Sequence, residues 1–143
     1  MKNLIFIFGL LCFISCTTKP QPLVAGKDAC NFCQMPVADT KFGAEIINEK
    51  GKLYKFDDIG CMNNFLKNKF GTNEKVKNIY TVIYTDNRKL MNVMESVFLK
   101  SPDLHSPMNS GTAAFESEDI ATSFLKDFPG EILTWDQLQQ KLK

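Results

Sequence analysis

The chain has 143 residues, with 17 lysines and arginines, 16 aspartates and glutamates and one histidine, so its formal net charge is +1. This balance gives no electrostatic reason to expect nucleic acid as a partner. The length suits one compact domain with a hydrophobic core and is short for two ordinary domains.

The N-terminal residues are typical of a secretory signal peptide. A short basic start precedes an apolar run, Leu4 to Ile14, which is shorter than the roughly 20 residues that span a bilayer. The run ends at FISC, which is similar to the box before the acylated cysteine of bacterial lipoproteins. We therefore expect residues 1–15 to be a lipoprotein signal peptide, Cys16 to carry lipid, and the polar residues 16–27 to be a membrane tether. This predicts a lipid-anchored protein on the periplasmic side of a bacterial membrane; an ordinary signal peptide followed by a free cysteine is the alternative.

Two later stretches share one frame, FDDIGCMNNFLK at 56–67 and FESEDIATSFLK at 115–126. Each begins with phenylalanine, continues with acidic residues and reaches Phe-Leu-Lys nine positions on. This pattern is typical of a strand that runs into a helix with capping oxygens at its N-terminus. The first apolar stripe runs to Phe70 and predicts a helix that Gly71 ends, and the second predicts one that Pro129 and Gly130 end.

Strand-like segments surround these helices. FGAEIIN and KLYKF precede the first helix, and NIYTVIYT precedes the second, whereas LMNVMESVFLK fits either a strand or a short helix. EILTWDQLQQKLK predicts a strand and a helix, with Thr134 and Gln137 at capping-box spacing. We therefore predict an α+β fold of duplicated strand-strand-helix-strand units, with antiparallel sheets and packed helices. The repeats would cover about 28–77 and 78–143 of a metal-binding domain at 28–143.

The segment DACNFCQMPVAD combines two thiols with a thioether. Cys30 and Cys33 have Cys-x-x-Cys spacing, and Met35 follows. Thiolates bind zinc, copper(I) and iron-sulfur clusters, whereas a thioether favours copper(I) over zinc. Pro36 favours extended backbone at Met35, and in an extended segment Cys33 and Met35 point the same way. We expect these two residues to bind copper(I), with Cys30 as a further candidate.

Other donors lie later in the chain. The loop SPDLHSPMNSG holds Met108, which we expect to be a third ligand, and His105, which is either a ligand or a solvated loop residue. Cys61 falls in the first turn of the predicted helix, where the positive helix end would lower a thiol pKa. It is therefore an auxiliary ligand or a buried structural cysteine. We interpret Asp57 and Asp58 as helix caps.

These motifs occur in the order CNFCQMPVAD, FGAEI, GKLYKFDDIGCMNNFL, SPMNSGTAAFES and GEILTWDQL, from Cys30 to about Leu138. The combination resembles the NosL family, the lipoprotein accessory factors encoded with nitrous oxide reductase. The resemblance implies a non-enzymatic periplasmic copper(I) chaperone that delivers copper for the copper-sulfide centre of the reductase and works with an ABC-type maturation complex. It also implies copper ligation by Cys33, Met35 and Met108. A metal-dependent dimer is a further possibility.

Two other functions compete with this interpretation. Cys30, Cys33, Cys61 and His105 make a complete Cys₃His set for structural zinc, although this leaves both methionines unexplained. The Cys30-x-x-Cys33 pair could also serve a thiol-disulfide oxidoreductase. Against this second alternative, the pair lacks a preceding strand and a following helix.

Overall fold

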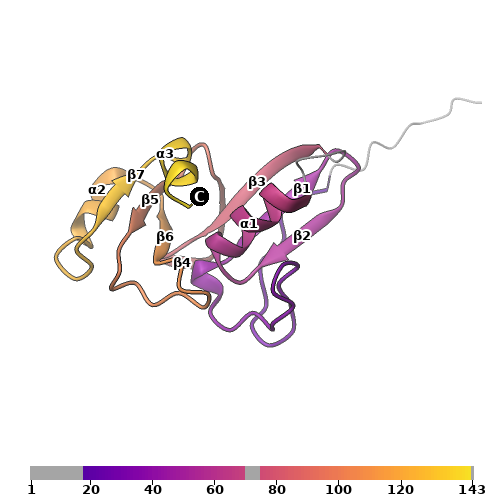
Figure 1. Ribbon diagram of the computed structural model, residues 1–143, viewed down its shortest axis with the longest axis horizontal. Helices are drawn as coiled ribbons and strands as arrows, with labels where there is room; N and C mark the ends of the chain where they lie inside the picture. The colour runs from indigo at the N-terminus through magenta and orange to yellow at the C-terminus, as the bar shows by residue number, and fades with distance from the viewer. Residues whose placement is uncertain (1–17, 70–74, 143) are drawn as a thin grey trace, which may run out of the picture.

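A computed structural model describes residues 18–69 and 75–142 of the protein. The described chain forms one seven-stranded, mostly antiparallel sheet with three α-helices (Figure 1). The expected signal peptide, Cys16 and the predicted helix end at Phe70 and Gly71 lie outside the described residues. The elements in chain order are a 3₁₀ helix at Thr40–Phe42, β1 at Ala44–Asn48, β2 at Leu53–Phe56, α1 at Ile59–Lys69, β3 at Val76–Ile83, β4 at Asp86–Asn92, β5 at Val97–Lys100, β6 at Thr112–Phe115, α2 at Glu118–Ser123, β7 at Glu131–Leu133 and α3 at Trp135–Lys141.

The strand order confirms the predicted duplication. The sheet runs β2-β1-β3-β6-β5-β7, and β4 pairs with β3 outside this path. In the first half β1 lies between β2 and β3 and is antiparallel to both, and in the second half β5 has the same relation to β6 and β7. The two halves form one continuous sheet because β3 reaches β6, where Ile83 pairs with Ala114 in parallel. The expected repeat boundary near residue 77 is too early, because it falls at the start of β3, and β3 pairs with β1 in the first half.

Helix caps follow the sequence closely. Thr134 and Gln137 form the predicted capping box of α3. The Ser117 hydroxyl accepts a hydrogen bond from the Ile120 backbone at the start of α2. Asp58 Oδ1 accepts one from the Gly60 backbone at 2.6 Å, as expected of a cap on α1.

In one segment the structure differs from the prediction, and in another it decides between two predicted alternatives. Helix α2 ends at Ser123, although the apolar stripe continues to Phe128, because residues 124–128 turn back with their own backbone hydrogen bonds. The ambiguous LMNVMESVFLK segment forms the end of β4, a turn and the strand β5.

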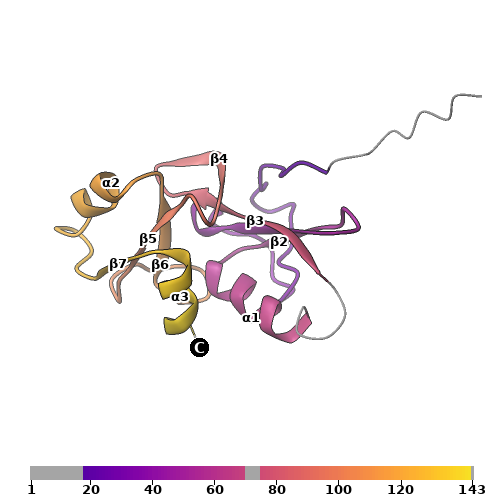
Figure 2. The ribbon, with the colours of Figure 1, turned by 90° about the horizontal axis from the view of Figure 1, so that it is seen from above.

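The sheet has packed side chains on both faces. In β5 the neighbours Phe98 and Leu99 point to opposite sides and join different core clusters. Helices α1 and α3 pack on the Phe98 side, and α2 packs on the Leu99 side (Figure 2). Met62 is fully buried on the α1 side, as its place in the apolar stripe predicts. None of the helices within residues 18–69 and 75–142 is both long and apolar enough to cross a membrane.

Residues 18–28, here called the N-terminal strap, cover the first half of the sheet on the face opposite α1. The Gln21 backbone donates to Glu45 Oε2 at 2.9 Å, and Leu23 is buried among apolar side chains. Glu45 alternates with Ala44 and Ile46, which face α1. The segment expected to be a tether is therefore in contact with the domain from Thr18 onward.

Candidate metal centre

The first two cysteines lie in a tight hairpin at residues 28–37, here called the cysteine hairpin. The Cys30 backbone donates to the Met35 carbonyl at 2.8 Å, and the Gln34 backbone donates to the Cys30 carbonyl at 3.0 Å. Gln34 has a φ of 65°, in the left-handed region. Cys33 therefore lies in the turn rather than in an extended segment, and the expected alternation that would align its side chain with that of Met35 is broken.

The cysteine hairpin is attached to the edge of β2. The Asn31 backbone donates to the Lys55 carbonyl at 2.8 Å, and the Lys55 backbone donates to Asn31 Oδ1 at 2.7 Å. Lys55 Nζ also forms an ion pair with Asp28 Oδ2 at 2.9 Å. These contacts hold the turn beside the point where β2 ends and α1 begins.

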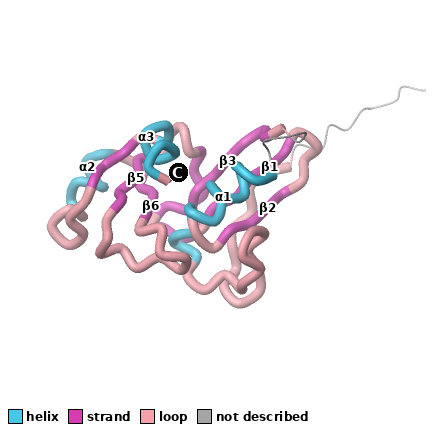
Figure 3. The backbone as a smooth tube through the Cα atoms, viewed as in Figure 1, coloured by secondary structure: helices cyan, strands magenta, loops and turns pink. Residues whose placement is uncertain are grey.

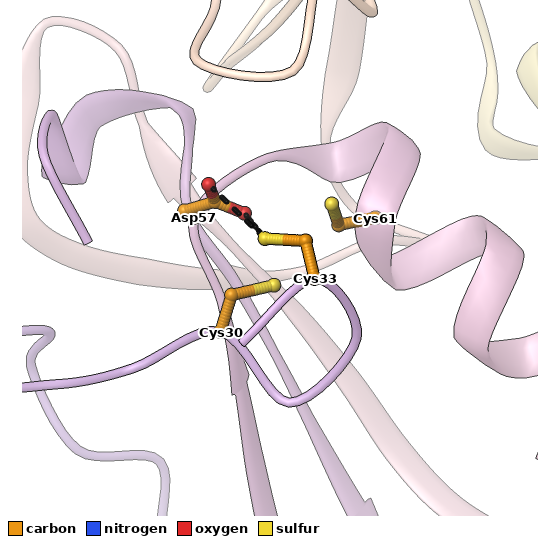
Figure 4. Close-up of side chains that lie close together, drawn as sticks. All are labelled: Cys30, Cys33, Asp57 and Cys61. Carbon is orange, nitrogen blue, oxygen red and sulfur yellow. Dashed lines mark hydrogen bonds between the residues drawn. The ribbon is translucent and has the colours of Figure 1, made fainter. Parts of the chain in front are cut away.

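At that point three thiols and one carboxylate meet. The Sγ atoms of Cys30, Cys33 and Cys61 and a carboxylate oxygen of Asp57 all lie within 4.8 Å of one another (Figure 4). Cys33 Sγ is 3.8 Å from each carboxylate oxygen of Asp57. Cys30, Asp57 and Cys61 are buried, and Cys33 is half-buried. We call these four residues the cysteine cluster.

Hydrogen bonds within the cluster favour the thiolate form of Cys30 over those of the other two cysteines. Hydrogen bonding with Cys61 lowers the pKa of Cys30 to about 4, against the opposing effect of burial. The same hydrogen bond and burial raise the pKa of Cys61, so the predicted lowering of this pKa by the helix end is wrong. Burial raises the pKa of Cys33, and burial followed by the nearby Cys30 raises the pKa of Asp57 to about 6.

This donor set fits a soft or borderline metal ion. Three thiols within bonding reach of one ion suit copper(I) or zinc, and the carboxylate suits zinc better than copper(I). Binding would release the protons that Cys33 and Cys61 carry, since the thiolate is the ligand form.

The two predicted methionine ligands line hollows that adjoin the cluster. Met35 is 46% exposed and lines a hollow with Asp57 and His105. Met108 is 41% exposed and lines a second hollow with Cys61. Each methionine thus shares a solvent-facing hollow with one member of the cluster.

The Met108 loop is held firmly against the start of α1. The Met108 backbone donates to Asp58 Oδ2 at 3.1 Å. Gly60 lies so close to the loop that a Cβ there would be 2.8 Å from Ser110 Cβ. Gly111 has a φ of 60°, and a Cβ there would be 2.4 Å from the Ser101 carbonyl oxygen. Figure 3 shows this loop and the cysteine hairpin on the same side of the molecule.

The structure places His105 outside the cysteine cluster and Asp57 within it. His105 is exposed in the Met35 hollow, so the structure does not bring it together with the three cysteines. Asp57, interpreted as a cap, is the fourth member of the cluster, whereas Asp58 alone caps α1. The sequence held a signal for the role of Asp57. One helix N-terminus needs one capping side chain, and two aspartates precede α1, so one of them was free for another role.

Comparison with known proteins places this chain in a family. The NosL family model matches residues 22–143. A solved structure, the crystal structure of the copper chaperone NosL from Shewanella denitrificans, has a TM-score of 0.71 and 17% sequence identity, and the match covers 84% of this chain and 95% of that one. At this identity the likeness shows a shared fold. Comparison with curated protein sequences found no significant match. The family-model match extends over most of the sequence, and the chain therefore belongs to the NosL family.

Proposed function

We propose that this protein is a non-enzymatic copper(I) chaperone. The observation that carries the proposal is the convergence of three thiols within 4.8 Å, flanked by two exposed thioethers. Thiolates and thioethers together form the donor chemistry that copper(I) prefers. The solved NosL structure from Shewanella denitrificans is that of a copper chaperone, which supports the same cargo for this chain.

The arrangement suits an ion that has to be handed on. Cys33 is half-buried and lies between the buried thiols and the solvent, so it is the natural first donor for incoming copper. The exposed Met35 and Met108 sulfurs are uncharged and cannot form disulfides, so they are suited to receiving or releasing copper at the surface. A partner's donor can enter through either hollow before the protein's own ligands leave.

The family and the N-terminus support a proposal for the client and the compartment. We propose lipid attachment at Cys16 on the periplasmic side of the membrane, supported by the signal-like residues 1–15. Family membership supports nitrous oxide reductase as the copper acceptor and an ABC-type maturation complex as a partner. Transfer of copper from the loaded chain to copper-free reductase, measured by reductase copper content, tests the client. If the copper stays on the chain and the reductase gains none, nitrous oxide reductase is not the acceptor.

The cargo is tested by anaerobic titration of the reduced chain from residue 16 onward with copper(I) against a competing chelator, with zinc titrated in parallel. Copper(I) binding that outcompetes zinc under equal conditions supports the chaperone. Sedimentation of the loaded and metal-free forms also tests the predicted metal-dependent dimer. Binding of zinc alone would overturn the copper proposal.

A structural zinc site is the second candidate, because Asp57 completes a Cys₃Asp set. Asp57→Asn separates the two functions, since a carboxylate serves zinc better than copper(I). For a zinc protein the substitution should weaken zinc about tenfold and lower the unfolding temperature of the zinc-bound form. For a copper carrier the copper(I) affinity should change by less than about threefold. The oxidoreductase alternative is less favoured, because Cys33 is followed by a left-handed residue and Pro36 instead of a helix.

A further inference from the structure

A group of lysines lies at the end of the molecule where the described chain begins. The Thr18 hydroxyl donates to the Gly51 carbonyl at 2.8 Å, which places the start of the strap on the β1–β2 turn. The Glu49 backbone donates to the Lys75 carbonyl at 3.0 Å, which brings the start of β3 to the same turn. The exposed lysines of this region, here called the lysine end, are Lys19, Lys50, Lys52, Lys69, Lys75 and Lys77.

These lysines converge although they come from separate elements. Lys52 after the turn and Lys69 at the end of α1 both lie over the Tyr54 ring, at 4.8 and 4.9 Å from its centroid. None of the ion pairs formed within residues 18–69 and 75–142 involves a lysine of this group. The acidic residues near it in sequence are Glu49 and Glu74, the second outside the described residues. Six lysines and two glutamates give this end of the molecule a net charge of +4. The whole chain has a net charge of only +1, so the rest of the chain is net negative.

We propose that the lysine end docks on the anionic lipid headgroups of the membrane that holds the protein. The inference rests on the proposed lipid attachment at Cys16. Cleavage before Cys16 leaves one residue, Thr17, between the lipidated cysteine and the docked Thr18. Two residues span about 7 Å when extended, which is comparable to the Debye length of about 8 Å at physiological ionic strength. The lysines are therefore held where headgroup charges attract them.

This docking fixes the direction of the metal centre. Helix α1 carries Cys61 in its first turn and Lys69 at its last residue. Its 11 residues rise about 16 Å. With the lysine end on the bilayer, the cysteine cluster, Met35 and Met108 face away from the membrane, toward a soluble acceptor.

The test uses the unacylated chain from residue 16 onward and needs neither lipid attachment nor copper. Co-sedimentation is measured with phosphatidylcholine vesicles, with and without phosphatidylglycerol. The wild-type chain should bind the anionic vesicles and lose binding as salt is raised. Lys50→Ser with Lys75→Ser should weaken this binding about tenfold or more. The matched control, Lys27→Ser with Lys126→Ser, removes the same charge from exposed positions elsewhere and should retain binding. Equal losses in both pairs, or equal binding to neutral vesicles, would overturn the proposal.

Acetylation of surface lysines, read by mass spectrometry, gives a second measurement on the wild-type chain. Anionic vesicles should protect the lysine end and leave Lys27, Lys89 and Lys126 reactive. Uniform protection, or protection centred on Lys27 beside the cysteine hairpin, would contradict the proposed orientation. The mass of the protein extracted from membranes reports acylation of Cys16 separately, and the copper titrations report the cargo. Failure of the docking is therefore distinguishable from failure of the proposed function.

Discussion

The two halves of the sheet have the same strand order, but different segments cover the face opposite the helix of each repeat. The N-terminal strap covers this face in the first half, and the C-terminal helix α3 covers it in the second. Ala44 pairs with Phe56 in the first half as Val97 pairs with Phe115 in the second. By this register Glu45 occupies the position that Phe98 has in the other half. The N-terminal strap covers Glu45, and α3 covers Phe98 through Trp135, with ring centroids 5.7 Å apart.

The difference between Glu45 and Phe98 indicates which of the two faces is less stable. Phe98 is buried in an aromatic contact, whereas Glu45 is a fully buried carboxylate. Burial raises the pKa of Glu45 to about 7, and its Oε1 has no hydrogen-bond partner among the described residues. A buried polar atom without a partner is costly, so the strap-covered face of the first half is less stable than its counterpart.

The same comparison shows what makes a metal site. Cys61 follows Phe56 by five positions, and Ile120 follows Phe115 by five. Both lie near the start of a helix that follows a strand. The first half alone has the cysteine hairpin in front of its repeat, which supplies two of the three thiols. The repeat therefore provides the frame, and the segment before it provides most of the ligands.

The largest effect is expected from a substitution that removes one thiol from the copper site in the first half. Cys33→Ser should weaken copper(I) binding at least about hundredfold, or about 2.7 kcal/mol, because a hydroxyl is a poor donor for a soft ion. The matched change in the second half, Ile120→Cys, should add no second copper, since no hairpin accompanies it. Chelator competition measures both variants. Full affinity in Cys33→Ser, or two bound coppers in Ile120→Cys, would refute this assignment.

Glu45→Gln should remove the pH-dependent part of the weakness of the strap-covered face, because an amide cannot ionise. The pKa of Glu45 in the folded protein, about 7, lies above the ordinary 4.5, so the folded state keeps a proton that the unfolded state has lost. The wild type should therefore lose stability as pH rises between these values, whereas the variant should lose less. Above the upper value the variant should be more stable by up to about 3 kcal/mol, and below the lower value the two should be similar. Urea unfolding across this pH range measures the difference; parallel pH profiles would contradict the prediction.

The methionines test how far the copper site extends beyond the thiols. Met35→Ala and Met108→Ala should each weaken copper(I) about tenfold, or about 1.4 kcal/mol, if the thioethers bind the ion. Met94→Ala is the matched control, because Met94 is 68% exposed and lines neither hollow. Equal affinity in all three variants would confine the copper to the cysteine cluster.

The smallest effect concerns the caps that occupy matching positions, Asp58 and Ser117. Ser117→Ala should lower the free energy of unfolding by about 1 kcal/mol and leave copper binding unchanged. Asp58→Ala should cost a similar amount and also weaken copper binding, because Asp58 holds the Met108 backbone. Chemical unfolding and copper titration of both variants provide the check. A copper defect in Ser117→Ala would show that the halves are coupled through the fold and not through this contact.

Local signals were sufficient to predict where the helices start and that a repeat is present, although not where α2 ends or where the repeats divide. The capping oxygens of Ser117 and Thr134 act within three residues, and the apolar stripe that buries Met62 repeats along one helix. Such short-range patterns can be recognised in the sequence. They also led to the α+β assignment, which the sheet confirms.

Contacts between distant residues could not be predicted. Asp57 meets Cys33 across 24 positions because the cysteine hairpin lies along β2, and no periodicity encodes that pairing. The left-handed backbone at Gln34 was hidden, since this conformation is usually signalled by glycine or asparagine. Leu23 is buried where the strap docks, but it stands in a run of only three apolar residues within a polar, proline-containing segment, which gave no clear sign of burial.

The junction between the halves determines how cooperatively the protein unfolds. Strands β3 and β6 share one aligned pair, Ile83 and Ala114, and the Tyr84 backbone adds a hydrogen bond to the Ala114 carbonyl. So short a ladder couples the halves weakly through the backbone. The Tyr84 ring contacts Phe42 from the first half and Phe115 from the second, at centroid distances of 5.5 and 5.6 Å. We therefore expect side-chain contacts of this kind, more than strand pairing, to make the two copies melt as a single unit.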